Sequence, residues 1–233
     1  MFDDFSKRNR AMQAALDLAV EQGWRNVTFT AIAERTGLGL ADLRREFTCK
    51  SDILKAFQAE VDAEVLAKTK PATPEQTEQT PRDRLFDLIM TRFEVIAPYK
   101  PALARIHADL CCRPGEAAQL LPSTLASQYW MLAAAGAKLE GAGAGLRVTG
   151  LAAIYAKVFR VWLDDASAGQ DRTMALLDRK LRTGERWATS MQAACEDMCR
   201  FACGFMPRGW KRRETGGTAE QAAGGPSPNL GAV

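Results

Sequence analysis

A stripe of cysteines near the end of the sequence is the first feature that could carry chemistry. Cys195, Cys199 and Cys203 recur every four residues, so on a helix they would share one face. Two cysteines four residues apart can chelate zinc. Cysteine is also a small, apolar-like residue that packs well in cores, and no CxxC pair accompanies the stripe. We therefore predict core packing here and no metal site.

The single histidine forms a second candidate group. His107 precedes Cys111 by four residues, and Cys112 follows directly. This grouping allows a metal or redox role, although ordinary helix positions are the simpler interpretation. The sequence has no GxSxG nucleophile motif and neither of the glycine-rich phosphate-binding patterns. We therefore predict no catalytic residues, no cofactor and no enzyme activity.

The composition is that of an ordinary globular protein. Of the 233 residues, 47% are hydrophobic and 25% are charged, and the formal net charge is +3. This mild basicity permits nucleic-acid binding without requiring it. No run of 18 apolar residues could span a membrane, and residues 1–5 lack the apolar core of a secretory signal. We expect a cytoplasmic protein with reduced cysteines.

The periodicity of the apolar residues predicts an all-α fold. Alanine and leucine are abundant, alternating strand patterns are scarce, and glycine and proline recur at helix-length intervals. Ser51 is the expected cap of a long fourth helix, and Pro81 the expected start of the next. Asp164 and Asp165 end an apolar helix and are expected to be solvated. The predicted helices cover residues 6–22, 30–36, 40–47, 51–67, 81–97, 102–112, 123–139, 146–163, 170–181 and 185–205.

Changes in composition divide the chain. Residues 68–83 are polar and contain proline without a hydrophobic period, which indicates a linker or loop. The segment from 207 is rich in glycine, alanine and proline and predicts a disordered tail. The predicted units are therefore residues 1–67, the linker 68–83, a helical domain over 84–206 and the tail 207–233.

Residues 28–47 have the features of a helix-turn-helix. Such a motif needs a supporting helix, a short turn that often contains glycine, and a second helix with an outward polar face. Ala33 is small where the two helices would cross, and Gly37 supplies the turn. Leu38 and Leu43 would fill the space between the helices.

The spaced residues of this segment closely resemble the pattern of the TetR family. The resemblance covers about residues 7–62 and implies an N-terminal module that binds operator DNA as a dimer. It also implies a variable helical C-terminal domain that dimerises and accepts a small ligand. The residues that carry the resemblance are Ala14-Ala15-Leu16, Gly23-Trp24, Val27-Thr28, Ile32-Ala33-Glu34-Arg35-Thr36-Gly37-Leu38, Leu43, Phe47, Lys50 and Ile53-Leu54.

The resemblance also implies a DNA-reading face on the second helix of the motif. The chain departs from the family there, with Gly39 in place of a small polar residue, Leu40 in place of a polar one and Arg44 in place of an aromatic one. Residues 23–50 hold five basic and three acidic side chains, so phosphate neutralisation by one module is modest. The predicted DNA-contacting residues are Thr28, Thr30, Gly39, Leu40, Ala41, Asp42, Arg44, Arg45 and Lys50.

The C-terminal domain is expected to form a homodimer and to hold an effector. Dimerisation is predicted through residues 146–163 and 185–205 as a four-helix arrangement. Aromatic residues on the predicted helices could line a pocket for a small apolar effector, although core packing is the default for most of them. These residues are Phe93, Tyr129, Trp130, Tyr155, Phe159 and Trp162.

A second interpretation rests on residues 151–187. Their apolar helix, acidic turn and amphipathic helix faintly resemble the TetR-fold accessory proteins of ubiquinone biosynthesis. That resemblance implies an isoprenoid-lipid-binding protein that has lost DNA binding. Lipid that co-purifies with the protein would distinguish it from a DNA-binding regulator.

Overall fold

The computed structural model describes residues 6–69, 79–137, 139–140, 143–167 and 169–186. Helices dominate these ranges and no strand occurs in them, which confirms the predicted all-α class. Every described residue belongs to one compact unit. The predicted boundaries at 67, 83 and 206 stay predictions. The stripe Cys195, Cys199 and Cys203 and the predicted tail lie outside the described residues.

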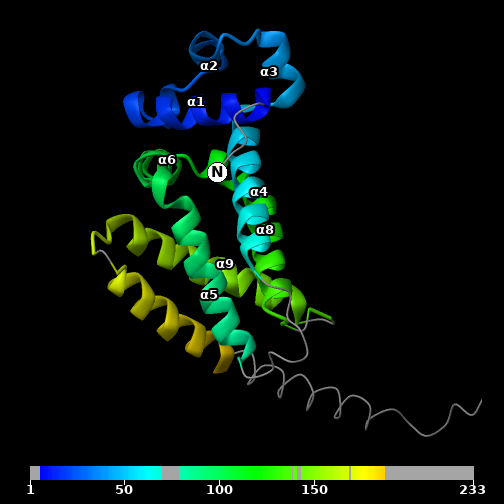
Figure 1. Ribbon diagram of the computed structural model, residues 1–233, viewed down its shortest axis with the longest axis vertical. Coiled ribbons are helices and arrows are strands. Elements are labelled where there is room, and N and C mark those ends of the chain that lie inside the picture. Colours follow the sequence, from blue (N-terminus) through cyan, green and yellow to red (C-terminus); the bar gives the residue numbers. More distant parts are fainter. Residues whose placement is uncertain (1–5, 70–78, 138, 141–142, 168, 187–233) are drawn as a thin grey trace, which may run out of the picture. The chain divides into compact units, whose positions relative to one another are not determined.

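Three short helices pack together at the start of the chain (blue, Figure 1). They are α1 (Lys7–Gln22), α2 (Phe29–Thr36) and α3 (Leu40–Glu46), with the 3-10 turn η1 (Trp24–Asn26) between the first two. We call α1 to α3, with η1, the three-helix module. The apolar side chains that its helices bury against one another stabilise the module. The buried side chains include Met12, Leu16, Trp24, Ile32, Leu43 and Phe47.

Helix α4 (Lys50–Lys68) leads from this module and packs against α8 (cyan beside green, Figure 1). Its cap differs from the sequence prediction, because Cys49 and not Ser51 is the N-cap residue. The Asp52 carboxylate accepts the backbone N–H groups of Thr48 (2.9 Å) and Cys49 (3.0 Å) and pairs with Lys55 at 3.0 Å. These contacts lower the pKa of Asp52 from 3.8 to about 2, the hydrogen bond from Lys55 being the largest cause.

Replacing Asp52 by asparagine removes the charge that strengthens its hydrogen bonds from Thr48 and Cys49 and its pair with Lys55, and it is expected to lower the free energy of unfolding by about 1 kcal/mol at pH 7. A carboxylate whose pKa is depressed on folding stabilises the fold above its unfolded pKa and loses that effect as it protonates. The difference between the two proteins should therefore be constant above about pH 4 and vanish toward pH 2. Urea titrations across this range measure it, and a pH-independent difference would contradict the capping role.

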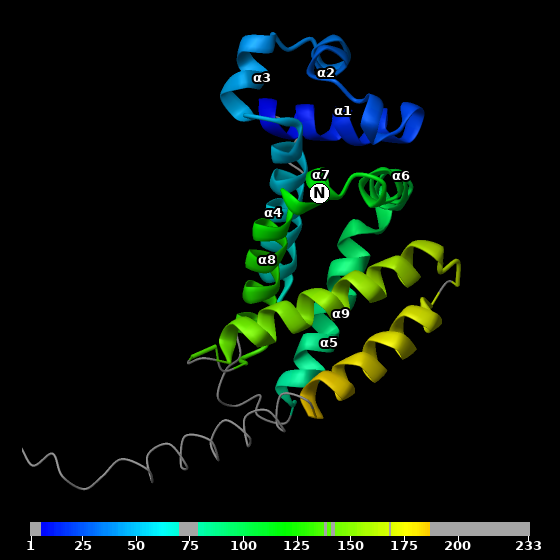
Figure 2. The same ribbon diagram turned by 180° about the vertical axis from the view of Figure 1, so that it is seen from behind.

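The remaining helices form the bundle that follows. Pro81 occupies the first turn of its helix, as predicted, with Thr80 as the cap. Figure 2 shows that the last described helix, residues 171–186, folds back beside α9. The elements before it are α5 (Pro81–Ile96), η3 (Ala97–Tyr99), α6 (Lys100–Cys111), α7 (Pro114–Ala118), α8 (Leu121–Ala134) and α9 (Ala144–Asp164).

A buried ion pair ties α4 to α5 and α8. Arg92 Nη1 lies 2.6 Å from Asp62 Oδ1, and Ser127 Oγ lies 2.5 Å from that nitrogen and 2.9 Å from that oxygen. The side chains of Arg92 and Asp62 are only 4% and 13% exposed. Burial raises the pKa of Asp62, against the opposing effect of the Arg92 charge. The guanidinium also lies over the ring of Tyr155, 5.0 Å from its centroid.

The acidic turn after α9 is structural. Asp165 is buried, so the expectation that it is solvated is wrong; Asp164 is exposed as expected. Asp165 accepts hydrogen bonds from the backbone and hydroxyl groups of both Ser167 and Thr173, which lowers its pKa. Its carboxylate therefore fixes the turn that starts helix 171–186.

Candidate nucleic-acid interface

Local backbone chemistry sets the turn between α2 and α3. Thr28 caps α2 by accepting the Ala31 N–H (3.2 Å). Gly37 ends it at φ 68°, and its N–H donates to Ala33 O at 2.8 Å. That left-handed conformation favours glycine. Gly39 then caps α3 without a side-chain hydrogen bond, so a serine there would add the bond that the family's small polar residue implies.

The inner side of this motif fixes which side of α3 faces outward. Ile32 of α2 and Leu43 of α3 are buried, and Phe47, directly after α3, is buried as well. Ala33 and Leu38 pack partly buried against the same core. Because Leu43 points inward, the residues on the opposite side of this helix are free to meet a partner.

The outer side of α3 is exposed and carries two arginines. Leu40 is 55% exposed, and Ala41 and Arg44 are exposed too. The Arg45 side chain is 78% exposed. Arginine is the commonest ligand of phosphate and of guanine edges in DNA, because its planar fork donates several hydrogen bonds.

Asp42, one of two acidic residues on α3, is already paired. Its Oδ1 lies 2.8 Å from Lys7 Nζ and 3.5 Å from Arg45 Nη1. The hydrogen bond from Lys7 is the main cause of a lowered pKa at Asp42. The carboxylate is therefore charged at neutral pH, and its repulsion of a phosphate is offset by the two neighbouring cations.

The basic start of α1 lies against α2 and α3 and was missed by the sequence reasoning. Besides the Lys7 pair, Arg8 lies over the Phe47 ring, 5.6 Å from its centroid, and Arg10 donates to Thr36 O at 2.5 Å. The signal in the sequence is three basic residues within four positions, 7 to 10. They add positive charge beside the exposed face of α3.

Three other predicted contact residues lie apart from that face. Thr28 and Thr30 are exposed at the start of α2. Lys50 is half-buried at the start of α4, where its Nζ donates to Trp24 O (2.9 Å) and lies 4.9 Å from the Trp24 ring centroid. Burial lowers the pKa of Lys50. Its ammonium thus has a structural partner within the module.

The aromatic residues proposed for an effector fall into two groups. Phe93, Tyr155, Phe159 and Trp162 stack on one another, with centroid separations from 5.3 to 5.9 Å. Phe93 and Trp162 are fully buried, so this group fills core space. Tyr129 and Trp130 lie away from it on α8, 45% and 55% exposed.

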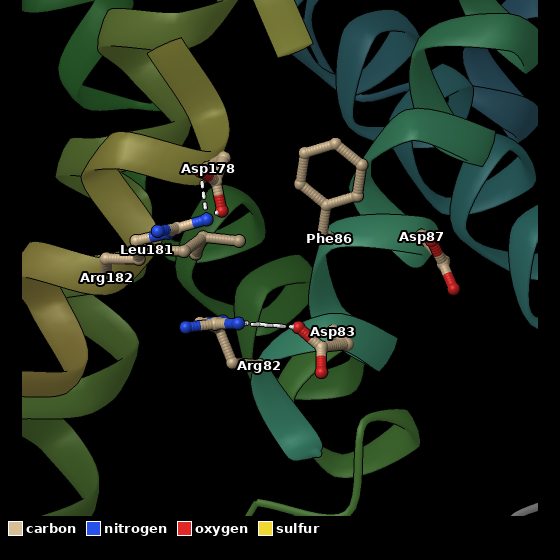
Figure 3. A pocket seen from close by; sticks show the side chains of 7 residues that line it. All are labelled: Arg82, Asp83, Phe86, Asp87, Asp178, Leu181 and Arg182. Carbon is tan, nitrogen blue, oxygen red and sulfur yellow. Dashed lines mark hydrogen bonds and ion pairs between the residues drawn. The ribbon is translucent and has the colours of Figure 1, made fainter. Parts of the chain in front are cut away.

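A cleft elsewhere in the bundle involves none of these aromatics. It has a volume of about 210 Å³ and opens between α5 and helix 171–186 (Figure 3). Phe86 and Leu181 supply its apolar surface, and each arginine in it pairs with an aspartate of its own helix (2.9 Å in both pairs). The other lining residues are Arg82, Asp83, Asp87, Asp178 and Arg182.

Neither a metal-binding cluster nor a membrane-spanning helix occurs in the described residues. No group of three or more histidine, cysteine, aspartate or glutamate side chains is placed there to hold a metal ion. None of the helices described is long and apolar enough to cross a membrane.

Solved structures share this arrangement of helices. A TetR transcriptional regulator from Nitrosomonas europaea covers 77% of this chain and 98% of its own length, with a TM-score of 0.60 and 19% identity. A TetR-family transcriptional regulator from Streptomyces coelicolor covers 87% of this chain and 94% of its own length, with a TM-score of 0.53 and 15% identity. A TetR transcriptional regulator from Rhodococcus sp. RHA1 covers 76% of this chain and 94% of its own length, with a TM-score of 0.52 and 19% identity. No family model and no curated protein matches the sequence. These likenesses show the TetR fold.

Proposed function

We propose that this chain, which has the fold of TetR-family transcriptional regulators, binds double-stranded operator DNA as a homodimer and regulates transcription. The observation that carries the proposal is the exposed basic face of α3, with Arg44 and Arg45 pointing away from a buried Leu43. An α-helix of this kind fits the major groove of B-form DNA. The role is binding rather than catalysis.

Charge supports contact with the DNA backbone. Lys7, Arg8 and Arg10 lie at the start of α1, which packs against α3. Together with the α3 arginines they place five cations around a face that holds Asp42 and Glu46 as its acids. We assign base contacts to α3, with Leu40 and Ala41 against thymine methyl groups, and phosphate contacts to α1 and to Thr28 and Thr30.

The homodimer is proposed to form through α9. Its exposed side includes Leu146, 42% exposed, and a row of small residues that would let a second helix approach closely. Of the partner helix predicted over residues 185–205, only positions 185 and 186 are described, and they continue helix 171–186, so the predicted break after residue 181 is wrong. A two-fold dimer would double the DNA contacts and match a palindromic site. The exposed α9 residues are Gly145, Leu146, Thr149, Gly150, Ala153, Ala156, Lys157, Arg160 and Asp164.

A mobility-shift titration of the full chain against the promoter region of its own gene tests the function. We expect a shift that persists in the presence of competitor DNA. The logarithm of the binding constant should fall linearly with the logarithm of the salt concentration, with a slope of about −0.9 for each phosphate neutralised. Absence of any specific shift at low salt would refute the regulator. Light scattering on the same sample tests the dimer independently.

A small apolar effector that changes DNA affinity completes the proposal; of the predicted aromatic residues, Tyr129 and Trp130 on α8 are exposed and available to contact it. The isoprenoid-lipid alternative makes a different prediction, since lipid would appear in native mass spectra of the purified protein. Protein that is free of lipid and shifts its promoter would support the regulator over the lipid carrier.

A further inference from the structure

His107 and Cys111 form a pair on α6 that the proposed DNA-binding function does not use. The Cys111 Sγ lies 3.6 Å from His107 Nε2, within hydrogen-bonding distance for sulfur. Cys111 is exposed, and His107 is half-buried behind it. Cysteine nucleophiles are activated by an adjacent histidine of this kind.

The imidazole is held in place from α9. Phe159 meets the ring edge-to-face, with centroids 5.8 Å apart and planes at 77°. The charges facing it are Arg160 and Asp164, both on α9. Burial, reinforced by Arg160, lowers the pKa of His107 below its ordinary 6.5. The ring is thus neutral at pH 7 and has a lone pair available to accept a proton.

We propose that Cys111 is a reactive thiol that adds to α,β-unsaturated carbonyl compounds, with His107 as its general base. The thiol proton passes to Nε2 as the sulfur electron pair forms a bond to the β carbon. The electron pair of the C=C bond moves onto the α carbon and carbonyl, and the resulting enolate takes the proton from the imidazolium. The step consumes no oxidant or reductant.

The site lies beside the junction with the three-helix module. Asp109, two residues before Cys111, accepts the backbone N–H of Arg25 in η1 at 2.9 Å. An adduct on Cys111 would form at this end of α6. The reactivity itself would stand whether or not the chain binds DNA.

Cys112 provides an internal control, because it is the next residue and is also exposed, while the single histidine contacts Cys111. The full chain carrying Cys111→Ser or Cys112→Ser leaves one thiol in this tryptic peptide. Each is treated with N-ethylmaleimide, and the rate of adduct formation is followed by mass spectrometry of that peptide. We expect Cys111 to react at least about tenfold faster than Cys112, a conservative effect for a positioned base.

His107→Phe in the Cys112→Ser background keeps an aromatic ring against Phe159 and removes the base, and it should reduce the Cys111 rate to that of Cys112. His107→Gln serves as a second variant if circular dichroism shows that the first is unfolded. The ratio of the Cys111 rate to the Cys112 rate should fall as pH drops through the lowered pKa of His107, because both thiols lose thiolate but only Cys111 loses its base. Equal rates at the two cysteines, or a Cys111 rate unchanged in a folded His107 variant, would overturn the assignment.

Discussion

Replacing both Arg44 and Arg45 by alanine is expected to weaken binding to the promoter fragment by at least about 30-fold, with helix content unchanged. Each exposed guanidinium can make a charge-assisted contact to a base edge or phosphate, and such a contact contributes about 1–3 kcal/mol. Neither side chain packs in the core, so the effect should fall on binding alone. Fluorescence anisotropy with labelled promoter DNA at fixed salt measures it.

Arg105→Ala is the matched control for this pair. Arg105 is an exposed arginine on α6, outside the face made by α1 and α3. Its removal tests whether any lost cation weakens binding through net charge. If the control weakens binding as much as the α3 variant does, or if the α3 variant binds normally, α3 is not the contact element.

The largest effect on stability is expected at the buried pair of Asp62 and Arg92. Removing one partner leaves the other charged and buried, which typically costs about 3–5 kcal/mol. Asp62→Ala and Arg92→Ala should each lower the free energy of unfolding by this amount. Chemical denaturation monitored by tryptophan fluorescence gives the values, because Trp24 and Trp162 are buried.

The double variant Asp62→Leu/Arg92→Met tests the cause. It replaces both charges with apolar groups of similar size, and such replacements are often neutral or stabilising. We therefore expect it to be more stable than either single variant. If instead the double variant lost the sum of the two single effects, the pair would not be coupled and the desolvation explanation would be wrong.

Much of the fold follows from local signals in the sequence. The 3.6-residue period of apolar residues places α1, α5 and α9 close to their observed bounds. Gly37 marks the turn because its positive φ favours glycine, and Pro81 marks a first helical turn because proline has no N–H to donate. Solved structures with the same arrangement of helices are 19% identical or less to this chain, so the fold tolerates wide variation in sequence.

The contacts of the site could not be read in the same way. Lys7 and Asp42 are 35 residues apart, so their pairing depends on how α1 crosses α3. The sequence predicts that Lys50 contacts DNA, yet its ammonium donates to the backbone carbonyl of Trp24. A backbone carbonyl is present at every position, so the sequence cannot indicate this partner. The buried Asp165 resembled a solvated acid for the same reason, since its partners lie in the next turn of chain.

The contact between Asp109 and η1 bears on how this module could be exchanged. The carboxylate accepts a main-chain N–H at position 25, which every amino acid except proline supplies. This contact therefore depends on the path of the backbone at position 25 and hardly on which residue occupies that position. A chimera that joins the three-helix module of another protein with this fold to this bundle should keep the contact whenever the module's backbone follows the same path, so this junction is a suitable place to exchange the module.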